Sequence, residues 1–327
     1  MNRGYIDMHC DSLEKALCAH REDLGSMPEI SVDAKRLAEA GAYAQFFACF
    51  LHQGDTPEWY GLTEMPDHWD LFLMMRELFF RTVERTPGLA FCGSARDYEA
   101  NRKNGFVSAL LTVENGYLVQ GEPERLRELR KLGVRLISLT WNDANCFGAP
   151  NSANPAVMAQ GLTPFGLEAV PFMNELGLIV DVSHLSDGGF WDVCRVAKKP
   201  FVASHSNCRA LSPHQRNLTD EMIRVLAERG GIAGLNFCPA FLLPAGTGRE
   251  SRVEDMCRHV LHLLRVGGED VIALGTDFDG IGGSLEIASC TELPRLFDAL
   301  LRAGLTERQL DKFTHGNAER VLRDCLG

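Results

Sequence analysis

The sequence contains no apolar stretch long enough to cross a membrane. None of its hydrophobic runs approaches the roughly 20 residues that span a bilayer. The first eleven residues, MNRGYIDMHCD, carry charges and lack the apolar centre of a signal peptide, and the C-terminal RVLRDCLG lacks the hydrophobic tail of a lipid-anchor signal. We therefore expect a cytoplasmic protein with no membrane partner.

Closely spaced cysteine pairs are also missing. The 11 Cys residues are scattered along the chain, and no two of them form a C-x-x-C motif. Without a secretory signal, this odd and dispersed set predicts reduced thiols, most of them small residues of the core. The pattern does not indicate a secreted protein held together by disulfides.

Basic residues are outnumbered by acidic ones. The chain has 33 Lys and Arg against 44 Asp and Glu, which gives a formal net charge of −11. Because binding to nucleic acid requires clustered Lys and Arg, we expect no nucleic-acid partner. No G-x-G-x-x-G motif opens a helix after an apolar run, so nothing supports a dinucleotide-binding fold. With 45% hydrophobic and 24% charged residues, the chain is typical of a folded globular protein.

Short apolar runs that alternate with amphipathic stretches predict strands and helices in turn. Such alternation indicates a parallel sheet with helices outside it, and eight units favour a closed (β/α)8 TIM barrel over a doubly wound open sheet. The predicted strands cover residues 4–9, 43–51, 107–114, 134–141, 178–184, 201–205, 232–237 and 271–277, and the clearest helical patterns cover 68–85, 123–132, 164–176, 220–229 and 253–266.

Local signals fit these helices. Thr163 and Thr219 occupy N-cap positions, and the run Thr306 to Gln309 has the form of a capping box. We find no linker and predict a single barrel domain over residues 1–327, closed by C-terminal helices. Gly residues stand where helices should end, at positions 133, 177, 230 and 267, and the segments 53–66, 94–104 and 142–163 are expected to be irregular.

Polar residues at the ends of the predicted strands carry the functional signal. In such a barrel, catalytic groups come from the C-terminal ends of the strands. Side chains alternate along a strand, so His9 and Asp11 should share one face while Cys10 points to the helix layer. Five of the eight predicted strands end in or just before a His or a carboxylate: His9 with Asp11, Glu114, His184, His205 and Asp277.

Imidazole and carboxylate together suit Zn²⁺ and, less specifically, other divalent metals such as Mn²⁺, Fe²⁺ or Co²⁺. One tetrahedral ion cannot use His9, Asp11, Glu114, His184 and His205 together, whereas two ions bridged by a carboxylate can. The residues therefore predict a metal-dependent hydrolase with two Zn²⁺ per chain. Taken singly, each residue has a structural interpretation, and the joint pattern is what favours the site.

The motifs resemble the membrane dipeptidase (renal dipeptidase) family of zinc peptidases, in its bacterial cytoplasmic branch. They occur in the family's order from residue 6 to residue 280, and together they are highly specific. The resemblance implies an amidohydrolase-like TIM barrel and a metallo-dipeptidase. The motifs are D-M-H-C-D at the start, V-E-N-G at 113–116, D-V-S-H at 181–184, S-H-S at 204–206 and G-T-D-F-D-G at 275–280.

The resemblance also implies a role for each residue. His9 and Asp11 would bind the first zinc, Glu114 would bridge both ions, and His184 and His205 would bind the second. A hydroxide between the metals would attack the peptide carbonyl.

Asp277 would act as the acid/base, and it would also contact the substrate. Arg216 would hold the substrate carboxylate, since a guanidinium can form paired hydrogen bonds with it. The substrates would be dipeptides, L-Xaa-D-Xaa included, and a homodimer is compatible with the family.

One position departs from the family. Its best-known members carry a His after the fourth strand that steadies the oxyanion, and here Trp141 falls at or beside that position. Asn142 or Asn145 are the candidates to donate instead, and Trp141 with Asn142 would border the substrate. Trp59 is interpreted as a packing residue.

Two alternatives stay open. One is another amidohydrolase-type chemistry, such as that of a lactonase, a deaminase or a cyclic amide hydrolase. The fourth predicted strand has no Lys to bridge two metals in the manner of many of those enzymes, and Glu114 stands on the third strand instead. The other is a non-catalytic metal-binding homologue. Asp7 and Asp181, on strands that carry ligands, are read either as hydrogen-bond partners of the ligands or as structural residues.

Overall fold

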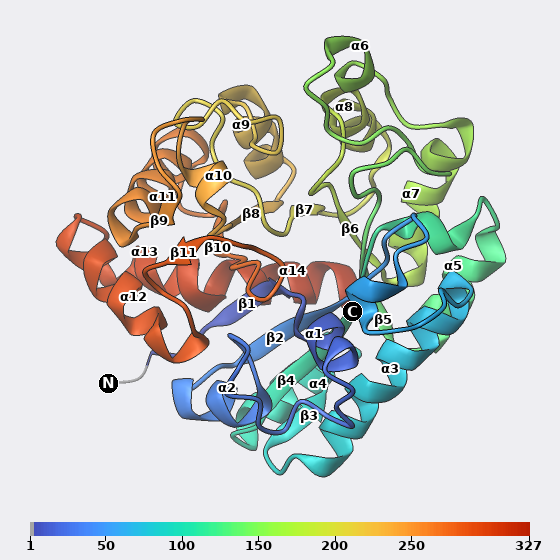
Figure 1. Ribbon diagram of the computed structural model, residues 1–327. Helices are drawn as coiled ribbons and strands as arrows, with labels where there is room; N and C mark the ends of the chain where they lie inside the picture. The colour runs from blue at the N-terminus through green and yellow to red at the C-terminus, as the bar shows by residue number, and fades with distance from the viewer. Residues whose placement is uncertain (1–2) are drawn as a thin grey trace.

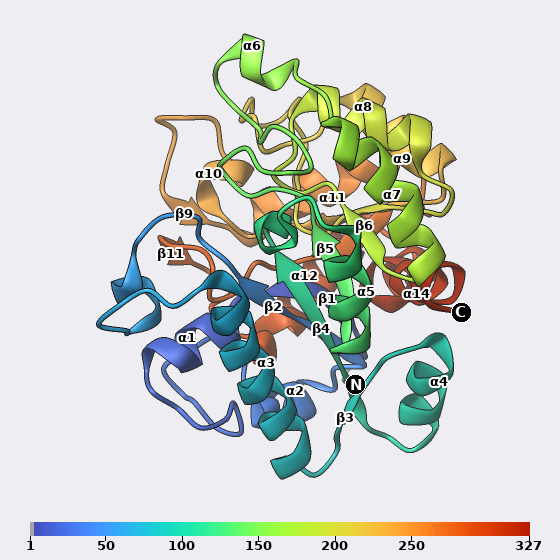
Figure 2. The same cartoon turned by 90° about the vertical axis from the view of Figure 1, so that its right-hand side faces the viewer.

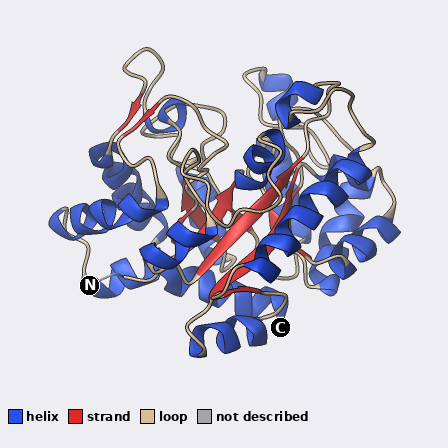
Figure 3. Ribbon diagram, turned by 60° about the horizontal axis from the view of Figure 1, so that its bottom comes forward, coloured by secondary structure: helices blue, strands red, loops and turns tan. Residues whose placement is uncertain are grey.

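The computed structural model describes residues 3–327. Eight parallel strands follow one another in the order β2, β1, β10, β8, β7, β6, β5 and β4, and β4 pairs back with β2, so that the sheet closes (Figures 1 and 3). The predicted TIM barrel is therefore confirmed, and the open sheet is wrong. The barrel strands are β1 (Ile6–Cys10), β2 (Ala44–Phe50), β4 (Val107–Glu114), β5 (Val134–Ser138), β6 (Ile179–Asp181), β7 (Val202–Ala203), β8 (Ile232–Leu235) and β10 (Ile272–Leu274).

Helices surround this barrel, as Figure 3 shows. No helix within residues 3–327 combines the length and the apolar character that crossing a membrane requires. The helices are α1 (Ser12–Cys18), α2 (Ala34–Ala40), α3 (His68–Arg85), α4 (Ala95–Lys103), α5 (Pro123–Lys131), α6 (Pro155–Met158), α7 (Pro164–Leu176), α8 (Asp187–Val196), α9 (Asp220–Glu228), α10 (Pro239–Leu242), α11 (Val253–Gly267), α12 (Leu293–Arg302), α13 (Glu307–Asp311) and α14 (Asn317–Leu326).

Shorter elements complete the chain. Strand β3 extends the sheet by pairing with β4, and β9 and β11 form a separate two-stranded sheet. These strands are β3 (Leu89–Phe91), β9 (Glu250–Ser251) and β11 (Ser284–Leu285), and the remaining turns are the 3₁₀ helices η1 (Pro57–Tyr60), η2 (Gly116–Val119) and η3 (Cys290–Glu292) and a π-helical turn (Lys312–Gly316).

Side-chain caps begin several helices where the sequence predicts them. Thr163 accepts a hydrogen bond from the Gly166 amide at the start of α7, and Thr219 does the same at α9. The capping box at Thr306 is present. One cap is displaced: Gly267 is the last residue of α11, and the next residue, Gly268, is the cap with φ +81°.

The prediction of an irregular segment over 94–104 is wrong, because α4 occupies most of it. Ser94 caps this helix by accepting a hydrogen bond from the Asp97 amide. Only one narrow face is buried, through Ala95, Tyr98 and Asn101, and the rest is charged or polar. A helix with so few apolar positions gives almost no periodic signal in the sequence.

The barrel interior is closed at the N-terminal ends of its strands. Inward-facing Ile6, Met8, Phe46 and Leu110 belong to one buried cluster that also contains Val321 of α14. Figures 1 and 2 show α14 lying against the strands at this end. Because this end is sealed by apolar side chains, polar groups inside the barrel are found towards the C-terminal ends.

Asp7 joins the strands at the seam where the chain's beginning meets its end. Its carboxylate accepts hydrogen bonds from the Thr276 amide at 2.8 Å, the Thr276 hydroxyl at 2.7 Å and Gln45 Nε2 at 3.2 Å. Burial raises the pKa of Asp7, although these hydrogen bonds oppose the shift. Asp7 thus binds the loop after β10, which carries Asp277, to β1, which carries His9.

The 11 Cys residues are all free thiols, and most of them are buried. Cys10 is fully buried in the cluster between the strands and the outer helices, on the predicted side. Strict alternation would turn it inward with Ile6 and Met8, and the irregular pairing of β1 with β2 between Asp7 and Cys10 changes its side.

Candidate metal centre and catalytic site

Six polar side chains converge at the C-terminal ends of the barrel strands, and each is at most 8% exposed. Glu114 is the last residue of its strand and His9 the next to last, and the others follow a strand within three residues. Because the strands are parallel and closed into a barrel, residues far apart in the sequence meet there. The six residues are His9, Asp11, Glu114, His184, His205 and Asp277.

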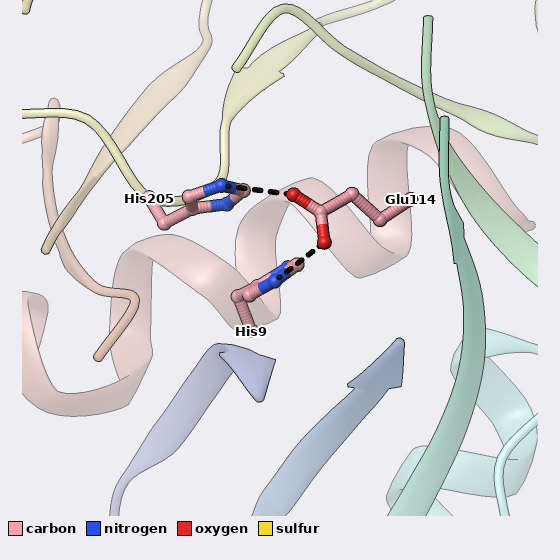
Figure 4. A group of neighbouring side chains, drawn as sticks. All are labelled: His9, Glu114 and His205. Atoms are coloured by element: carbon pink, nitrogen blue, oxygen red, sulfur yellow. Dashed lines mark ion pairs between the residues drawn. The ribbon is translucent and has the colours of Figure 1, made fainter. Parts of the chain in front are cut away.

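Glu114 lies at the centre of this group. Its Oε2 is 3.4 Å from His9 Nε2, and its Oε1 is 3.0 Å from His184 Nε2 and 3.6 Å from His205 Nε2. Figure 4 shows the carboxylate between His9 and His205, with one oxygen directed at each imidazole. One carboxylate therefore faces two groups of ligand atoms: a first group on His9 and Asp11, and a second group on His184 and His205.

The two imidazoles of the second group present bare nitrogen atoms. The Ser204 hydroxyl donates a hydrogen bond to the Asp181 carboxylate at 2.6 Å, because a carboxylate can only accept. Its single proton is then used, so Ser204 Oγ must accept the hydrogen bond from His205 Nδ1 at 2.7 Å. His184 Nδ1 lies 3.3 Å from Asn142 Oδ1, an acceptor. Each ring therefore carries its proton on Nδ1, and both Nε2 atoms hold lone pairs.

These lone pairs point at each other without a proton between them. His184 Nε2 and His205 Nε2 are 3.1 Å apart, and both approach the same oxygen of Glu114. Three acceptors cannot satisfy one another, and buried acceptors without partners are costly. A divalent cation is the group that this arrangement fits, because neutral imidazole and carboxylate are its ordinary ligands.

The first group fits a cation as well. His9 Nε2 is 3.2 Å from Asp11 Oδ2, and the second oxygen of Asp11 is buried without a hydrogen-bond partner. Two sets of residues in this region have ligand atoms close enough to share one ion: His9 with Glu114 and His205, and His9 with Asp11 and Asp277. These two sets are the candidate metal sites.

The pKa values in the cluster separate the two groups. Burial opposes the charge on His9, yet Asp11 and Glu114 raise its pKa well above the usual value. Burial and the nearby Arg216 lower the pKa of His184 to about 4, and burial and His9 lower that of His205 well below its usual value. His184 and His205 are therefore neutral in neutral solution, whereas His9 carries a proton in the absence of a metal.

Asp277 stands beside the cluster and titrates unlike an ordinary carboxylate. Burial raises its pKa to about 8, with further contributions from Asp11 and Glu114, while His9 opposes the shift. Asn236 Nδ2 donates to Asp277 Oδ2 at 2.7 Å and fixes the carboxylate. The backbone of Asp277 has φ +62°, in the left-handed region that few non-Gly residues adopt.

A cavity of about 1000 Å³ opens above these residues. Arg216 lines it and is buried, and its guanidinium donates to the His205 carbonyl at 3.1 Å and to Ser206 Oγ at 3.2 Å. Arg216 Nε has no partner, and the residue forms no ion pair among the described residues. A buried cation with no carboxylate within ion-pair distance among the described residues is suited to bind an anionic group that enters the cavity.

Comparison with known proteins places the whole chain in one family. The model of the membrane dipeptidases, peptidase family M19, matches residues 3–325. The chain belongs to peptidase family M19.

Similar proteins agree with this assignment. A dipeptidase of Schizosaccharomyces pombe is 32% identical over 302 residues, which cover 88% of this chain and 71% of that protein. The crystal structure of an M19 metallopeptidase, dipeptidase AC, is 30% identical with a TM-score of 0.87 and complete coverage of both chains. A metallopeptidase of Rhodobacter sphaeroides, solved with a phosphinate mimic of L-Ala-D-Ala, is 28% identical with a TM-score of 0.87, over 99% of this chain and 100% of its own.

This M19 dipeptidase therefore hydrolyses peptide bonds, and its barrel holds two candidate metal sites at the expected end. Trp141 and Asn142, predicted to border the substrate, both line the cavity. Asn145 does not: its amide donates to Asn115 and to the Leu139 carbonyl, so it holds the loop instead.

Several features of this M19 site could not be found from sequence patterns. The series of hydrogen bonds that joins Asp181, Ser204 and His205 depends on the pairing of β6 with β7. Asn236 lies at 0% exposure behind Asp277 and not on the cavity surface. Trp59, interpreted as a packing residue, lines the cavity and is 40% exposed.

Metal uptake by the metal-free M19 dipeptidase is expected to release protons and to strengthen as the pH rises through neutrality. His9, with its raised pKa, holds a proton that a cation must displace, and Asp11 has a pKa raised to about 6 by burial and Glu114. Titration calorimetry with zinc chloride in buffers of different ionisation enthalpy measures the release. A binding heat that is the same in all buffers would contradict this prediction.

Proposed function

We propose that this M19 dipeptidase works with two Zn²⁺ ions and cleaves dipeptides, including those of the form L-Xaa-D-Xaa. His9 and Asp11 would hold one ion, His184 and His205 the other, and Glu114 would bridge them. The observation that carries this proposal is the position of Glu114, whose two oxygens face different histidine groups.

When bound, such ions lower the pKa of water and polarise the peptide carbonyl. The remaining work belongs to the chain itself. Asp277 is held by Asn236 next to the ligand cluster, and its raised pKa lets it accept a proton from water and donate it to the departing amine at neutral pH.

Arg216 would bind the carboxylate at the C-terminus of the dipeptide. Two of its nitrogen atoms are already fixed by His205 and Ser206, so its orientation is set before substrate arrives. This pairing explains a preference for dipeptides over longer peptides, because the free carboxylate must follow the scissile bond by one residue.

The dipeptide assignment is supported over other hydrolase chemistries on similar barrels. The Rhodobacter sphaeroides relative was solved with a mimic of L-Ala-D-Ala. A buried guanidinium that lines the cavity fits a substrate with a free carboxylate, which every dipeptide has, whereas lactones, nucleobases and cyclic amides need not carry one. A non-catalytic homologue would have no need for Asp277 on the cavity wall, held by Asn236 beside the ligand cluster.

The test is a metal analysis by mass spectrometry together with hydrolysis of L-Xaa-L-Xaa and L-Xaa-D-Xaa dipeptides. We expect about two metal ions per chain and release of free amino acids. Two ions without hydrolysis of any dipeptide would reject the substrate class, and fewer than two after reconstitution would reject the ligand assignment.

Arg216→Ala is expected to lower kcat/KM for dipeptides by about 10²- to 10³-fold, because two charge-assisted hydrogen bonds to the substrate are lost. For dipeptide amides, which lack the carboxylate, the substitution should lower kcat/KM far less. The readout is the ratio of kcat/KM for L-Ala-D-Ala to that for its amide. Arg195→Ala is the matched control, because Arg195 does not line the cavity and pairs with Asp192 at the surface. An equal loss for acid and amide would exclude carboxylate binding.

A further inference from the structure

Three aromatic side chains form one side of the cavity, and we call Phe50, Trp59 and Trp141 the aromatic wall. Trp141 lies edge-on to Phe50 at 5.0 Å between ring centroids and to Trp59 at 6.1 Å, and Phe50 stacks on Trp59 at 6.0 Å. All three line the cavity. Trp59 keeps 40% of its surface exposed, although large apolar side chains are usually covered.

Ring contacts and hydrogen bonds from neighbouring residues hold the aromatic wall in place. His52 packs against Trp59 at 4.6 Å and Trp141 at 5.3 Å, and its Nδ1 accepts a hydrogen bond from the Gly54 amide. The Tyr60 hydroxyl accepts from the His52 amide, which ties η1 to the end of β2. Gln53 then donates to the Ala144 carbonyl and joins the loop after β2 to the loop after β5.

The position of the aromatic wall follows from the strand order. Phe50 is the last residue of β2 and Trp59 lies in η1, in the loop that follows β2, whereas Arg216 follows β7. In the closed barrel three strands separate β2 from β7 in either direction, so the two lie on opposite sides of the mouth. The ligand cluster lies between them, and Trp141 is 6.1 Å from His184 at its edge.

We infer that the aromatic wall is the subsite for the N-terminal side chain of the dipeptide and selects a large apolar or aromatic residue there. This inference rests on the proposed function. With the carboxylate at Arg216 and the peptide carbonyl at the ligand cluster, the N-terminal residue must extend to the far side, where the exposed face of Trp59 stands. An aromatic or branched aliphatic side chain would bury that face and gain ring contacts.

The test compares kcat/KM for L-Phe-D-Ala, L-Leu-D-Ala, L-Ala-D-Ala and L-Lys-D-Ala. For the wild-type enzyme we expect L-Phe-D-Ala to exceed L-Ala-D-Ala by at least about tenfold, and Trp59→Ala to reduce that ratio by about tenfold. Trp59→Phe should recover most of the preference. Phe106→Ala, a matched change of an aromatic residue that is 42% exposed elsewhere on the surface, should leave the ratio unchanged.

The outcomes separate this inference from the proposed function. If the metal-loaded enzyme cleaves none of the four dipeptides, the proposed function fails. If it cleaves L-Ala-D-Ala but shows no preference for L-Phe, or if Trp59→Ala leaves the ratio unchanged, only the subsite is wrong. A preference for L-Lys would overturn the assignment in favour of a cation-binding wall.

Discussion

Replacing Glu114 by Gln is expected to abolish binding of both metal ions and leave a folded but inactive chain. Both oxygens of Glu114 face ligand nitrogens, one towards His9 and the other towards His184 and His205. The amide has one oxygen fewer and no negative charge, so at most one site keeps an oxygen from this residue, and the bridge between the two sites is lost. Activity should fall by more than about 10³-fold, the scale expected for metal-dependent activation of water.

The same substitution should not unfold the metal-free protein. The new NH₂ group would donate to a bare imidazole nitrogen, which relieves the contact between the acceptors of His184 and His205. Metal content by mass spectrometry and thermal melting with and without zinc measure the two effects. In the wild type zinc should raise the melting temperature, and in Glu114→Gln it should not.

Glu14→Gln is the control for this experiment. Glu14 is also a buried carboxylate that lines the cavity, but it pairs with Lys15 and stands outside the histidine cluster. This variant should keep about two metal ions. If Glu114→Gln also keeps both, Glu114 is not the bridge.

Asp277→Asn is expected to slow turnover by about 10³- to 10⁴-fold while metal content stays unchanged, because an amide cannot exchange the proton that general acid/base catalysis requires. The change should be well tolerated, since Asn236 can donate to the remaining oxygen of the side chain. The measurements are kcat on L-Ala-D-Ala and metal content on the same sample.

The metal measurement decides between two roles. Asp277 Oδ1 lies 3.8 Å from His9 Nε2, and the residue is part of one candidate ligand set with His9 and Asp11. Loss of one ion from Asp277→Asn would make it a ligand and not the acid/base. Asp279→Asn is the matched change in the same loop: its carboxylate accepts from Ser12 and the Ser31 amide, so stability should fall while kcat stays within about tenfold.

The barrel could be predicted from sequence because its signals are local. Each strand is a short apolar run, and Thr163 and Thr219 mark helix starts with their own side chains. Glu114 is conspicuous for the same reason, since a carboxylate at the end of the apolar run of β4 needs a partner. The helix α4 lacks such signals, because polar residues cover most of its surface.

The finer features of the site depend on which strands are neighbours. The protonation of His205 follows from Ser204 and Asp181, whose contact exists only once β6 and β7 pair. Trp59 has no sequence signal for a role in the cavity, because its partner Trp141 comes from a loop far along the chain. The sequence alone does not distinguish Asn145 from Asn142, because only the loop geometry directs the Asn145 amide towards Asn115.

The position of β1 between β2 and β10 also governs how this chain can be made. A ribosome releases the N-terminus first, and β1 ends at residue 10, whereas β10 begins at residue 272. One edge of β1 therefore stays unpaired until β10 has been translated, and α14, which covers the end of the barrel, emerges after β10. An unpaired strand edge invites pairing with other chains. During the interval between translation of β1 and of β10, pairing of β1 with another chain therefore competes with folding.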